Sequence, residues 1–327
     1  NIAIGRQALF TQNYDGDAYN IAIGYKAGFA VTTGTKNTLI GASAGDALVG
    51  GDNNTVLGYN AMGAANGTES RNVAIGSNAL AAMNHNTSNY NVAVGYDAGV
   101  SVTTGLYNTI VGGQAGDALT EGNSNVAIGY LSLSAETLGD RNVAVGRGAL
   151  QNQNNTSDTD VYNIAVGYNA GANVTTGTDN TIVGGLAGDA LTTGALNVAI
   201  GKAALSAEDT GSANVAVGHA ALMSQNYNGS AYNTAVGHNA GTAVTTGVQN
   251  TLIGGLAGDA LTTGSNNIAI GVDALSAEID GGRNVAIGKS ALEDLNTDSN
   301  AYNVAIGHAA GASAQPGAAR RALPNPF

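Results

Sequence analysis

The two histidines best placed to bind a metal occupy equivalent positions of a repeated motif. His219 and His238 each follow the Gly of an Asn-x-x-x-Gly segment. If consecutive segments stack as neighbouring strands, about 5 Å apart, the two imidazoles lie close enough to share an ion. Two imidazoles without a third ligand make a weak metal site, and other copies of the motif place Tyr25 or Tyr130 there. We therefore favour a ladder of surface side chains over a metal site, and we expect no cofactor.

Carboxylates recur in two further short sequences, AGDAL and SAE. Copies of each would lie roughly 19 Å apart in a stack of strands, too far for two carboxylates to catalyse a reaction together. We interpret both sets as solvated turn residues, and we expect no catalytic residue and no enzymatic activity. The residues are Asp46, Asp117, Asp189 and Asp259 in the first sequence and Glu136, Glu208 and Glu278 in the second.

Pairs of adjacent threonines raise a different function, the binding of ice by a flat array of hydroxyls. The Thr-Thr-Gly sequence occurs in at most two of every four copies of the motif, whereas an ice-binding array would use threonine on every coil. We keep ice binding as a minor alternative. The pairs begin at Thr32, Thr103, Thr175, Thr192, Thr245 and Thr262.

The repeat that positions all these residues is Asn-x-x-(Ile/Val/Leu)-Gly-x-x-(Ala/Ser). All eighteen copies keep the Asn and the Gly, and most begin 17 residues after the previous copy. A longer linker follows every fourth copy, which defines larger repeats over residues 1–71, 72–141, 142–213, 214–283 and 284–311. The copies begin at Asn1, Asn20, Asn37, Asn54, Asn72, Asn91, Asn108, Asn125, Asn142, Asn163, Asn180, Asn197, Asn214, Asn233, Asn250, Asn267, Asn284 and Asn303.

A 17-residue period predicts a parallel β-solenoid. It is too short for a helix-turn-helix repeat of about 34 residues and suits one coil with two short strands and two turns. We expect the first strand in segments such as 73–75 and a second in segments such as 118–120 and 174–176. Residues 1–311 should form about 18 coils, and residues 312–327, which contain all three Pro and the pair Arg320 and Arg321, an irregular or capping tail.

Side-chain alternation within the strand suggests how the coils pack. Val73 and Ile75 should point to one face and Ala74 to the other. We expect the large aliphatic residues to fill the core. The opposite face of Ala and Gly would then be flat and apolar, so we expect it to pack against other copies of the chain.

The invariant Asn has a structural explanation. Asn at a turn can bond both to local backbone and to the Asn of the neighbouring coil. We therefore predict a buried structural ladder rather than a binding site. Its first members after Asn1 are Asn20, Asn37, Asn54, Asn72, Asn91, Asn108, Asn125 and Asn142.

Composition excludes several partners. The 23 acidic and 11 basic residues give a net charge of −12 and are scattered along the chain, whereas nucleic acids and anionic membranes require clustered Lys and Arg. Cysteine is absent, so the chain has neither disulfides nor thiolate metal ligands. No apolar run approaches the roughly 18 residues of a membrane span, and the first residues do not resemble an export signal. We expect neither nucleic-acid binding nor membrane insertion.

The long linkers are the best candidates for recognition. They are rich in Asn, Asp, Ser and Tyr, which suits a surface that binds glycans weakly at many points. The alternative is that they are polar loops whose last Tyr packs over the next coil. The candidate binding residues are Tyr14, Tyr19, Asn84, Tyr90, Asn154, Tyr162, Tyr227, Tyr232, Asn296 and Tyr302.

The repeats NVAIGSNAL, NVAVGYDAG and NTIVGGQAG, which begin at Asn72, Asn91 and Asn108, resemble two families. One is the head of trimeric autotransporter adhesins, a left-handed parallel β-roll of the YadA type. The other is the β-helical shaft of bacteriophage tail fibres. The resemblance covers residues 1–311 and implies a left-handed homotrimer, extracellular on a bacterial surface or a phage particle. It also implies a glycan or protein receptor and neighbouring fibre proteins at the open ends. The chain lacks the adhesin stalk and membrane barrel, which leaves the choice between the two families open.

These observations predict a non-enzymatic extracellular attachment fibre. The chain begins at Asn1 on a repeat boundary, so we expect the open edge of the first coil to meet a preceding segment or another molecule. A structural filament whose subunits stack end to end is therefore an alternative function. Ice binding is the second alternative.

Overall fold

The computed structural model describes residues 1–297, 299–313 and 321–322. It confirms an all-β parallel solenoid of about eighteen coils with a spacing of mostly 17 residues, and the described residues contain no helix. The chain divides into two compact units, Asn1–Tyr162 and Asn163–Phe327, which we describe separately.

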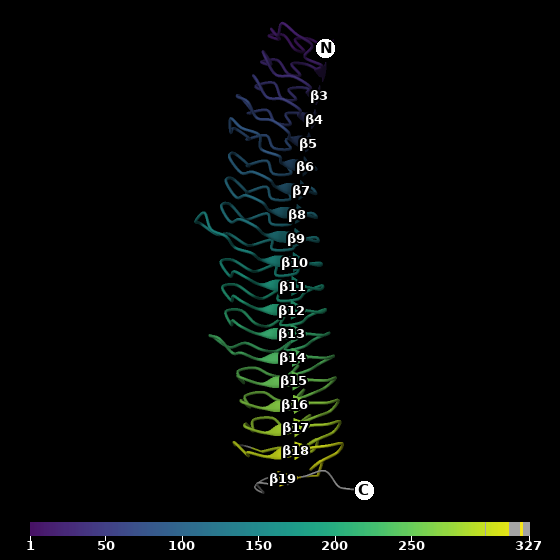
Figure 1. Cartoon of the computed structure of the whole chain (residues 1–327), viewed down its shortest axis with the longest axis vertical. Coiled ribbons are helices and arrows are strands. Elements are labelled where there is room, and N and C mark those ends of the chain that lie inside the picture. Colours follow the sequence, from purple (N-terminus) through teal and green to yellow (C-terminus); the bar gives the residue numbers. More distant parts are fainter. Residues whose placement is uncertain (298, 314–320, 323–327) are drawn as a thin grey trace. The chain divides into compact units, whose positions relative to one another are not determined.

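Each coil contributes one three-residue strand to a parallel sheet, and each strand pairs in register with the next within its unit (Figure 1). The strands of the first unit are β1 (Ile2–Ile4), β2 (Ile21–Ile23), β3 (Thr38–Ile40), β4 (Thr55–Leu57), β5 (Val73–Ile75), β6 (Val92–Val94), β7 (Thr109–Val111), β8 (Val126–Ile128) and β9 (Val143–Val145). Those of the second unit are β10 (Ile164–Val166), β11 (Thr181–Val183), β12 (Val198–Ile200), β13 (Val215–Val217), β14 (Thr234–Val236), β15 (Thr251–Ile253), β16 (Ile268–Ile270), β17 (Val285–Ile287), β18 (Val304–Ile306) and β19 (Arg321–Ala322).

The expected second strand of the coil is wrong. Residues 118–120 and 174–176 lie in turns and bends. The reason is visible in the preceding backbone, where Gln114 and Gly116 have φ values of 52° and 50°. Two left-handed residues so close together produce successive tight turns and exclude an extended run. These turns still bond to the next coil, for example through the N–H of Gly99 and the carbonyl of Ala115 at 3.0 Å.

The orientation expected for the strand is also wrong. The middle residue of each strand, such as Ala74 or Ala93, points inward and is fully buried, whereas Val73 and Ile75 face outward and remain partly exposed. The interior therefore holds small strand residues and the Leu, Val and Met side chains of the turns. The exposed apolar face consists of Ile, Val and Leu rather than of Ala and Gly.

The four-coil period follows from packing in this narrow interior. Once in each larger repeat the middle strand residue is large, as in Ile110, and the facing turn positions of the same and the preceding coil are glycines, Gly116 and Gly99. A Cβ on Gly99 would lie 2.8 Å from Cδ1 of Ile110. One bulky side chain thus fills the room left by two glycines, which keeps the core dense. Leu39, Ile182 and Leu252 repeat the arrangement.

The invariant Asn side chains form a continuous buried ladder. In Asn37, Nδ2 donates to the carbonyl of Gly51 at 2.7 Å, and Oδ1 accepts from the backbone N–H of Asn54 at 2.9 Å. Each Asn thus closes its own coil and ties it to the next, and the side chains are almost completely buried. Such a ladder satisfies backbone groups that no sheet bond reaches.

Part of the C-terminal tail pairs with the sheet. The backbone of β19 lies parallel to β18, with Arg321 opposite Val304 and Ala322 opposite Ala305. Arg320 and the three prolines, Pro316, Pro324 and Pro326, lie outside the described residues.

Candidate binding surfaces

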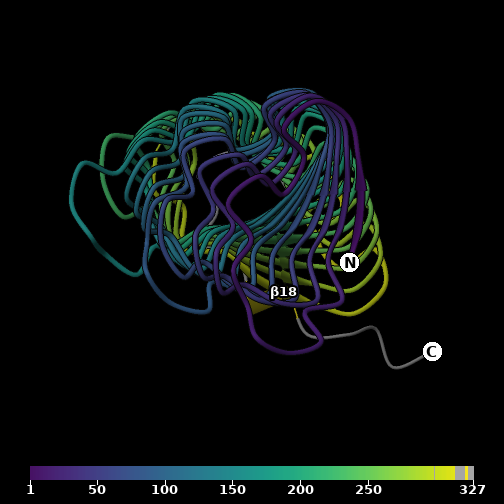
Figure 2. The same cartoon turned by 90° about the horizontal axis from the view of Figure 1, so that it is seen from above.

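The extra residues of each long linker are confined to one point of the coil. Backbone bridges join Ser70 to Ser88, Asp140 to Asp160 and Ser212 to Ser230, and the inserted residues end just before the second member of each pair. The excursions are therefore short, residues 86–87, 156–159 and 228–229. Figure 2 shows the linkers of the first unit standing out beyond the shorter coils in successive directions, with the teal loop near residue 155 extending furthest.

The candidate recognition residues lie on these linkers and are exposed, except Tyr227, which is half-buried against its own loop. The Tyr that ends a linker does not pack only over the next coil. The guanidinium of Arg71 in the preceding coil lies 5.3 Å from the ring centre of Tyr90, and Tyr107 stacks on that ring from the following coil at 5.7 Å. Arg141 with Tyr162 and Arg283 with Tyr302 repeat the cation–π contact.

A second surface is the outer strand face, which we define as the first and third residues of β1–β18. It consists of Ile, Val, Leu and Thr, and many of these side chains are more than a third exposed, including Ile4, Leu57, Ile128, Ile200 and Ile306. Parallel sheets are normally covered on both faces. An apolar face on this scale indicates an interaction surface.

Two columns of side chains border the outer strand face. The pre-strand column holds the residue before each Asn, such as Arg71 and Tyr90, and the post-strand column holds the residue after each Gly, such as Tyr96 and Arg147. Eleven of the 13 Tyr belong to these columns. The chain has 11 Lys and Arg, of which Arg320 and Arg321 are in the tail; of the other nine, eight are in the columns and Lys26 directly follows Tyr25. Aromatic and Arg side chains around an apolar centre are typical of protein interfaces.

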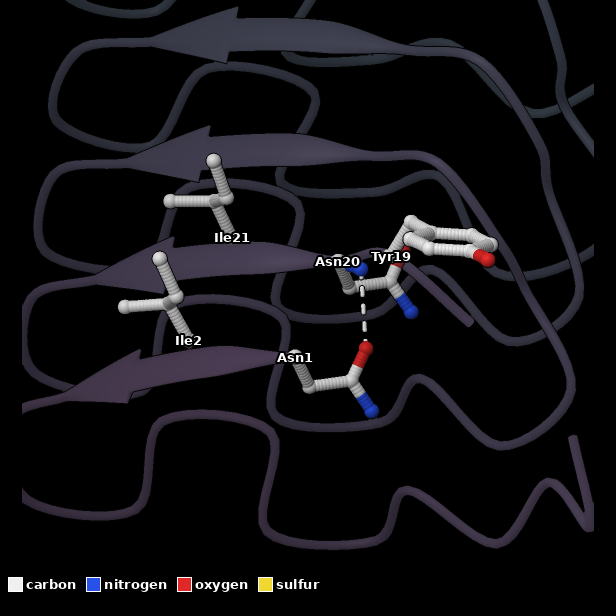
Figure 3. A pocket seen from close by; sticks show the side chains of 5 residues that line it. All are labelled: Asn1, Ile2, Tyr19, Asn20 and Ile21. Atoms are coloured by element: carbon white, nitrogen blue, oxygen red, sulfur yellow. Dashed lines mark hydrogen bonds between the residues drawn. The ribbon is translucent and has the colours of Figure 1, made fainter. Parts of the chain in front are cut away.

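A shallow pocket lies on this surface at β1 and β2. Its volume is about 310 Å³, and it is lined by Asn1, Ile2, Tyr19, Asn20 and Ile21. In Figure 3, Ile2 and Ile21 project side by side from the strands, and Oδ1 of Asn1 accepts a 2.8 Å hydrogen bond from the backbone N–H of Asn20. The pocket presents apolar surface with one aromatic side chain at its border and has no charged side chain in its lining.

The structure brings His219 and His238 together in the post-strand column. Their rings are stacked at 5.3 Å, with an interplanar angle of 13°, and both side chains are exposed. Within residues 1–297, 299–313 and 321–322, no group of three or more His, Cys, Asp or Glu side chains is arranged to hold a metal. The pair belongs to the same column as Tyr25 and Tyr130.

The interpretation of the SAE glutamates as solvated turn residues is wrong. Glu136, Glu208 and Glu278 are fully buried, and each carboxylate accepts hydrogen bonds from its own turn and from the next coil. The sequence contained a signal for this. The same position of the repeat holds Leu119, Val174 or Leu191 in other coils, so it faces the interior.

The Asp residues of the AGDAL turns are half-buried. Burial raises the pKa of the carboxyl groups of Asp46, Asp117, Asp189 and Asp259, with weaker opposing hydrogen bonds. One oxygen of Asp117 and one of Asp259 are buried without a hydrogen-bond partner among the described residues. Burial also raises the pKa of Glu208, although Gly211, Tyr227 and Gln225 donate to it.

These shifts predict that the protein is more stable in mild acid than at neutral pH. A carboxyl whose pKa is raised by folding is less favourable as an ion in the folded state. Its contribution to the free energy of unfolding is complete below the unfolded pKa, near 3.8 for Asp, and is lost as the pH rises through the higher folded value. The exposed Asp280, whose pKa is lowered by the hydroxyls of Thr262 and Thr263, acts in the opposite direction.

The measurement is the unfolding temperature between pH 8 and pH 5, followed by circular dichroism. We expect it to rise as the pH falls, and the double variant Glu208→Gln with Asp189→Asn should respond less. An unfolding temperature that falls over this range in the wild type would contradict the prediction.

The threonine pairs are partly committed to the coil stack. The first Thr of several pairs donates its hydroxyl to a carbonyl of the next coil, as Thr175 does to Thr192 at 3.1 Å and Thr192 to Asp209 at 2.9 Å. Those hydroxyl protons are therefore already engaged. A measurement of thermal hysteresis tests ice binding directly.

In the part of the chain that the structure describes, no helix has the length and apolar character needed to cross a membrane. Comparisons of the chain with protein-family models, with curated proteins and with solved structures found no match.

Proposed function

We propose that the chain is a non-enzymatic extracellular attachment fibre, in which copies associate through the outer strand face and the long linkers bind a surface weakly at many points. The observation that carries the proposal is the repetition of both surfaces. The apolar face recurs at every coil, and the linkers recur every four coils. A stiff stack of this kind suits mechanical support and multivalent contact.

The outer strand face supports self-association. Its nine coils in each unit, together with both columns, present about 850 Å² at the usual strand dimensions. A stable interface buries about 800 Å² on each partner. A second copy has the same axial spacing, so its rows of Ile and Val can match along the whole face. The resemblance to adhesin heads and tail fibres favours a left-handed homotrimer among the oligomers that satisfy this requirement.

A charge in the middle of this face should separate the copies. Ile200, the last residue of β12, is 38% exposed. We expect Ile200→Lys to shift the protein from oligomer to monomer in sedimentation experiments, because an interface would have to bury the ammonium group. Thr193→Lys, an exposed position away from the outer strand face, is the matched control and should leave the oligomer intact. A monomeric wild type would exclude this part of the proposal.

The recognition role is tested by shortening the linkers. The variant lacks the excursions 86–87, 156–159 and 228–229, which returns three coils to 17 residues. If the linkers bind glycans, the trimmed protein should lose binding on a glycan array while it keeps its circular dichroism spectrum. Identical binding profiles for the two proteins would count against the linkers as the recognition sites.

Among the alternatives, end-to-end stacking has one specific observation in its favour. Every strand is parallel and in register with its neighbour, so a further coil from another molecule can extend the same ladder. Electron microscopy of the purified protein separates the two functions. Discrete rods support the attachment fibre, and indefinite filaments support the stacked subunit.

A further inference from the structure

The buried glutamates lie directly beneath the long linkers. Glu136, Glu208 and Glu278 each belong to the coil that precedes a long one, and each is fully buried. A buried carboxylate is costly unless several donors satisfy it. The identity of those donors indicates what each glutamate does.

Each carboxylate binds the point at which the linker leaves the coil. Asn155 donates its backbone N–H to Oε1 of Glu136 at 3.1 Å, and Thr297 donates to Oε1 of Glu278 at 3.0 Å. Tyr227 contacts Glu208 in the same way at 3.3 Å. The three donors are equivalent residues, each 19 positions after its glutamate.

Side chains of the linker add to this contact. Gln153 donates to Glu136 at 2.9 Å and Gln225 donates to Glu208 at 3.2 Å, while the hydroxyl of Thr297 donates to Glu278 at 2.9 Å. The carboxylate also accepts from its own turn, through the N–H of Gly139, Gly211 or Gly281. Charged hydrogen bonds in a buried setting are stronger than neutral ones.

The far end of two of these excursions is fixed as well. The bridge from Asp140 to Asp160 closes residues 156–159, and the bridge from Ser212 to Ser230 closes residues 228–229. The glutamate therefore holds the start of the excursion and the bridge holds its end. A loop fixed at both ends loses less conformational entropy on binding than a mobile one.

The second larger repeat provides a natural contrast. Its preceding coil has Ala65 where the others have Glu, and Glu69 reaches toward the same turn instead. Glu69 accepts from the N–H of Gly67 at 2.9 Å, but its other oxygen has no partner among the described residues. Nδ1 of His85, at the position of Asn155 and Tyr227, is likewise buried without one. The linker that contains His85 thus has no glutamate contact at its start.

We propose that Glu136, Glu208 and Glu278 are positioning residues that hold three of the long linkers in one conformation for binding. The inference rests on the proposed recognition function, but the fixing of the loops can be measured without any ligand. It assigns these buried charges to the presentation of the loops rather than to the stability of the coil stack as a whole.

Hydrogen exchange measured by mass spectrometry tests the inference on the full chain. In Glu208→Ala, amides of residues 226–230 should exchange about tenfold faster, which corresponds to about 1.4 kcal/mol. Residues 250–254 in β15 should be unchanged, and Glu208→Gln should give an intermediate rate because it keeps one acceptor oxygen. Unchanged exchange at 226–230, or equal acceleration throughout the second unit, would overturn the proposal.

A reverse variant in the first unit gives an independent test. Ala65→Glu combined with Glu69→Gly reproduces the arrangement of Glu136 and Gly139 beneath the linker of residues 84–89. Slower exchange at residues 85–87 supports the inference, and unchanged or faster exchange contradicts it. Glycan binding is measured separately on the wild type. A wild type that binds no glycan contradicts the proposed function, whereas the exchange rates still decide whether the glutamates fix the loops.

Discussion

Gly254→Ala should destabilise the second unit by about 4 kcal/mol or more, whereas Gly255→Ala, one residue later, should change its stability by less than about 1 kcal/mol. Gly254 ends β15 with a φ of 136°, a conformation that residues with a Cβ rarely adopt. A Cβ at this position would lie 2.4 Å from the carbonyl oxygen of Gly271 in the next coil. Both the backbone conformation and the space therefore exclude a side chain.

The clash cannot be relieved locally. The N–H of Gly254 donates to Val236 at 2.8 Å, and the N–H of Gly271 donates to Ile253 at 2.7 Å. Moving the coils apart to admit a methyl group would break these bonds between buried groups, each of which costs about 1–3 kcal/mol when left unsatisfied.

Gly255 is the matched control, because the same substitution there meets open space. The nearest atom to a Cβ at Gly255 is the carbonyl oxygen of His238 at 4.0 Å, and its φ is not in the left-handed region. The measurement is urea-induced unfolding of both variants, with hydrogen exchange to locate the effect within the second unit. Similar unfolding midpoints for the two variants would show that the glycine is not required by the stacking of the coils.

The sequence alone predicted the solenoid because its evidence is periodic. Eighteen copies of Asn and Gly at a nearly constant spacing leave few structures other than stacked coils, and the buried ladder from Asn20 onward occupies the place expected for it. The spacing also located the long linkers, because each is measured against coils that have the common length.

The errors came from reading the strand as an isolated segment. A three-residue strand such as Val73–Ile75 alternates correctly, but alternation does not say which side is inside. The larger side chains are outside because the interior is already filled by turn residues such as Leu80 and Met83. Comparison of equivalent positions among coils would have indicated this, because Ile110 and Leu39 replace Ala only at the middle strand position.

The same comparison would have identified the buried glutamates. Glu136 shares its position with Leu119 of the previous coil, and a charged residue at an interior position requires partners. Their identity could not be predicted from the repeat, since the donors come from a linker whose path depends on inserted residues.

Asn250→Ala should cost about 3–5 kcal/mol, because it leaves two buried backbone groups without partners. Nδ2 of Asn250 donates to the carbonyl of Gly264 at 2.9 Å, and Oδ1 accepts from the N–H of Asn267 at 2.9 Å. Asn250 is fully buried, so water cannot replace either bond without opening the coil. The loss interrupts the ladder between one coil and the next.

Asn250→Asp separates the two contributions. The aspartate keeps an acceptor for the N–H of Asn267 but cannot donate to Gly264 when it is ionised, and it buries a charge. We expect it to be at least as destabilising as Asn250→Ala near neutral pH and to recover stability in acid, where a protonated carboxyl can donate to Gly264. Asn226→Ala, at an exposed linker position, is the control and should unfold like the wild type. If Asn250→Ala also unfolds like the wild type, the Asn ladder is not what joins the coils, and the sheet bonds with the packed core must be sufficient to hold the stack.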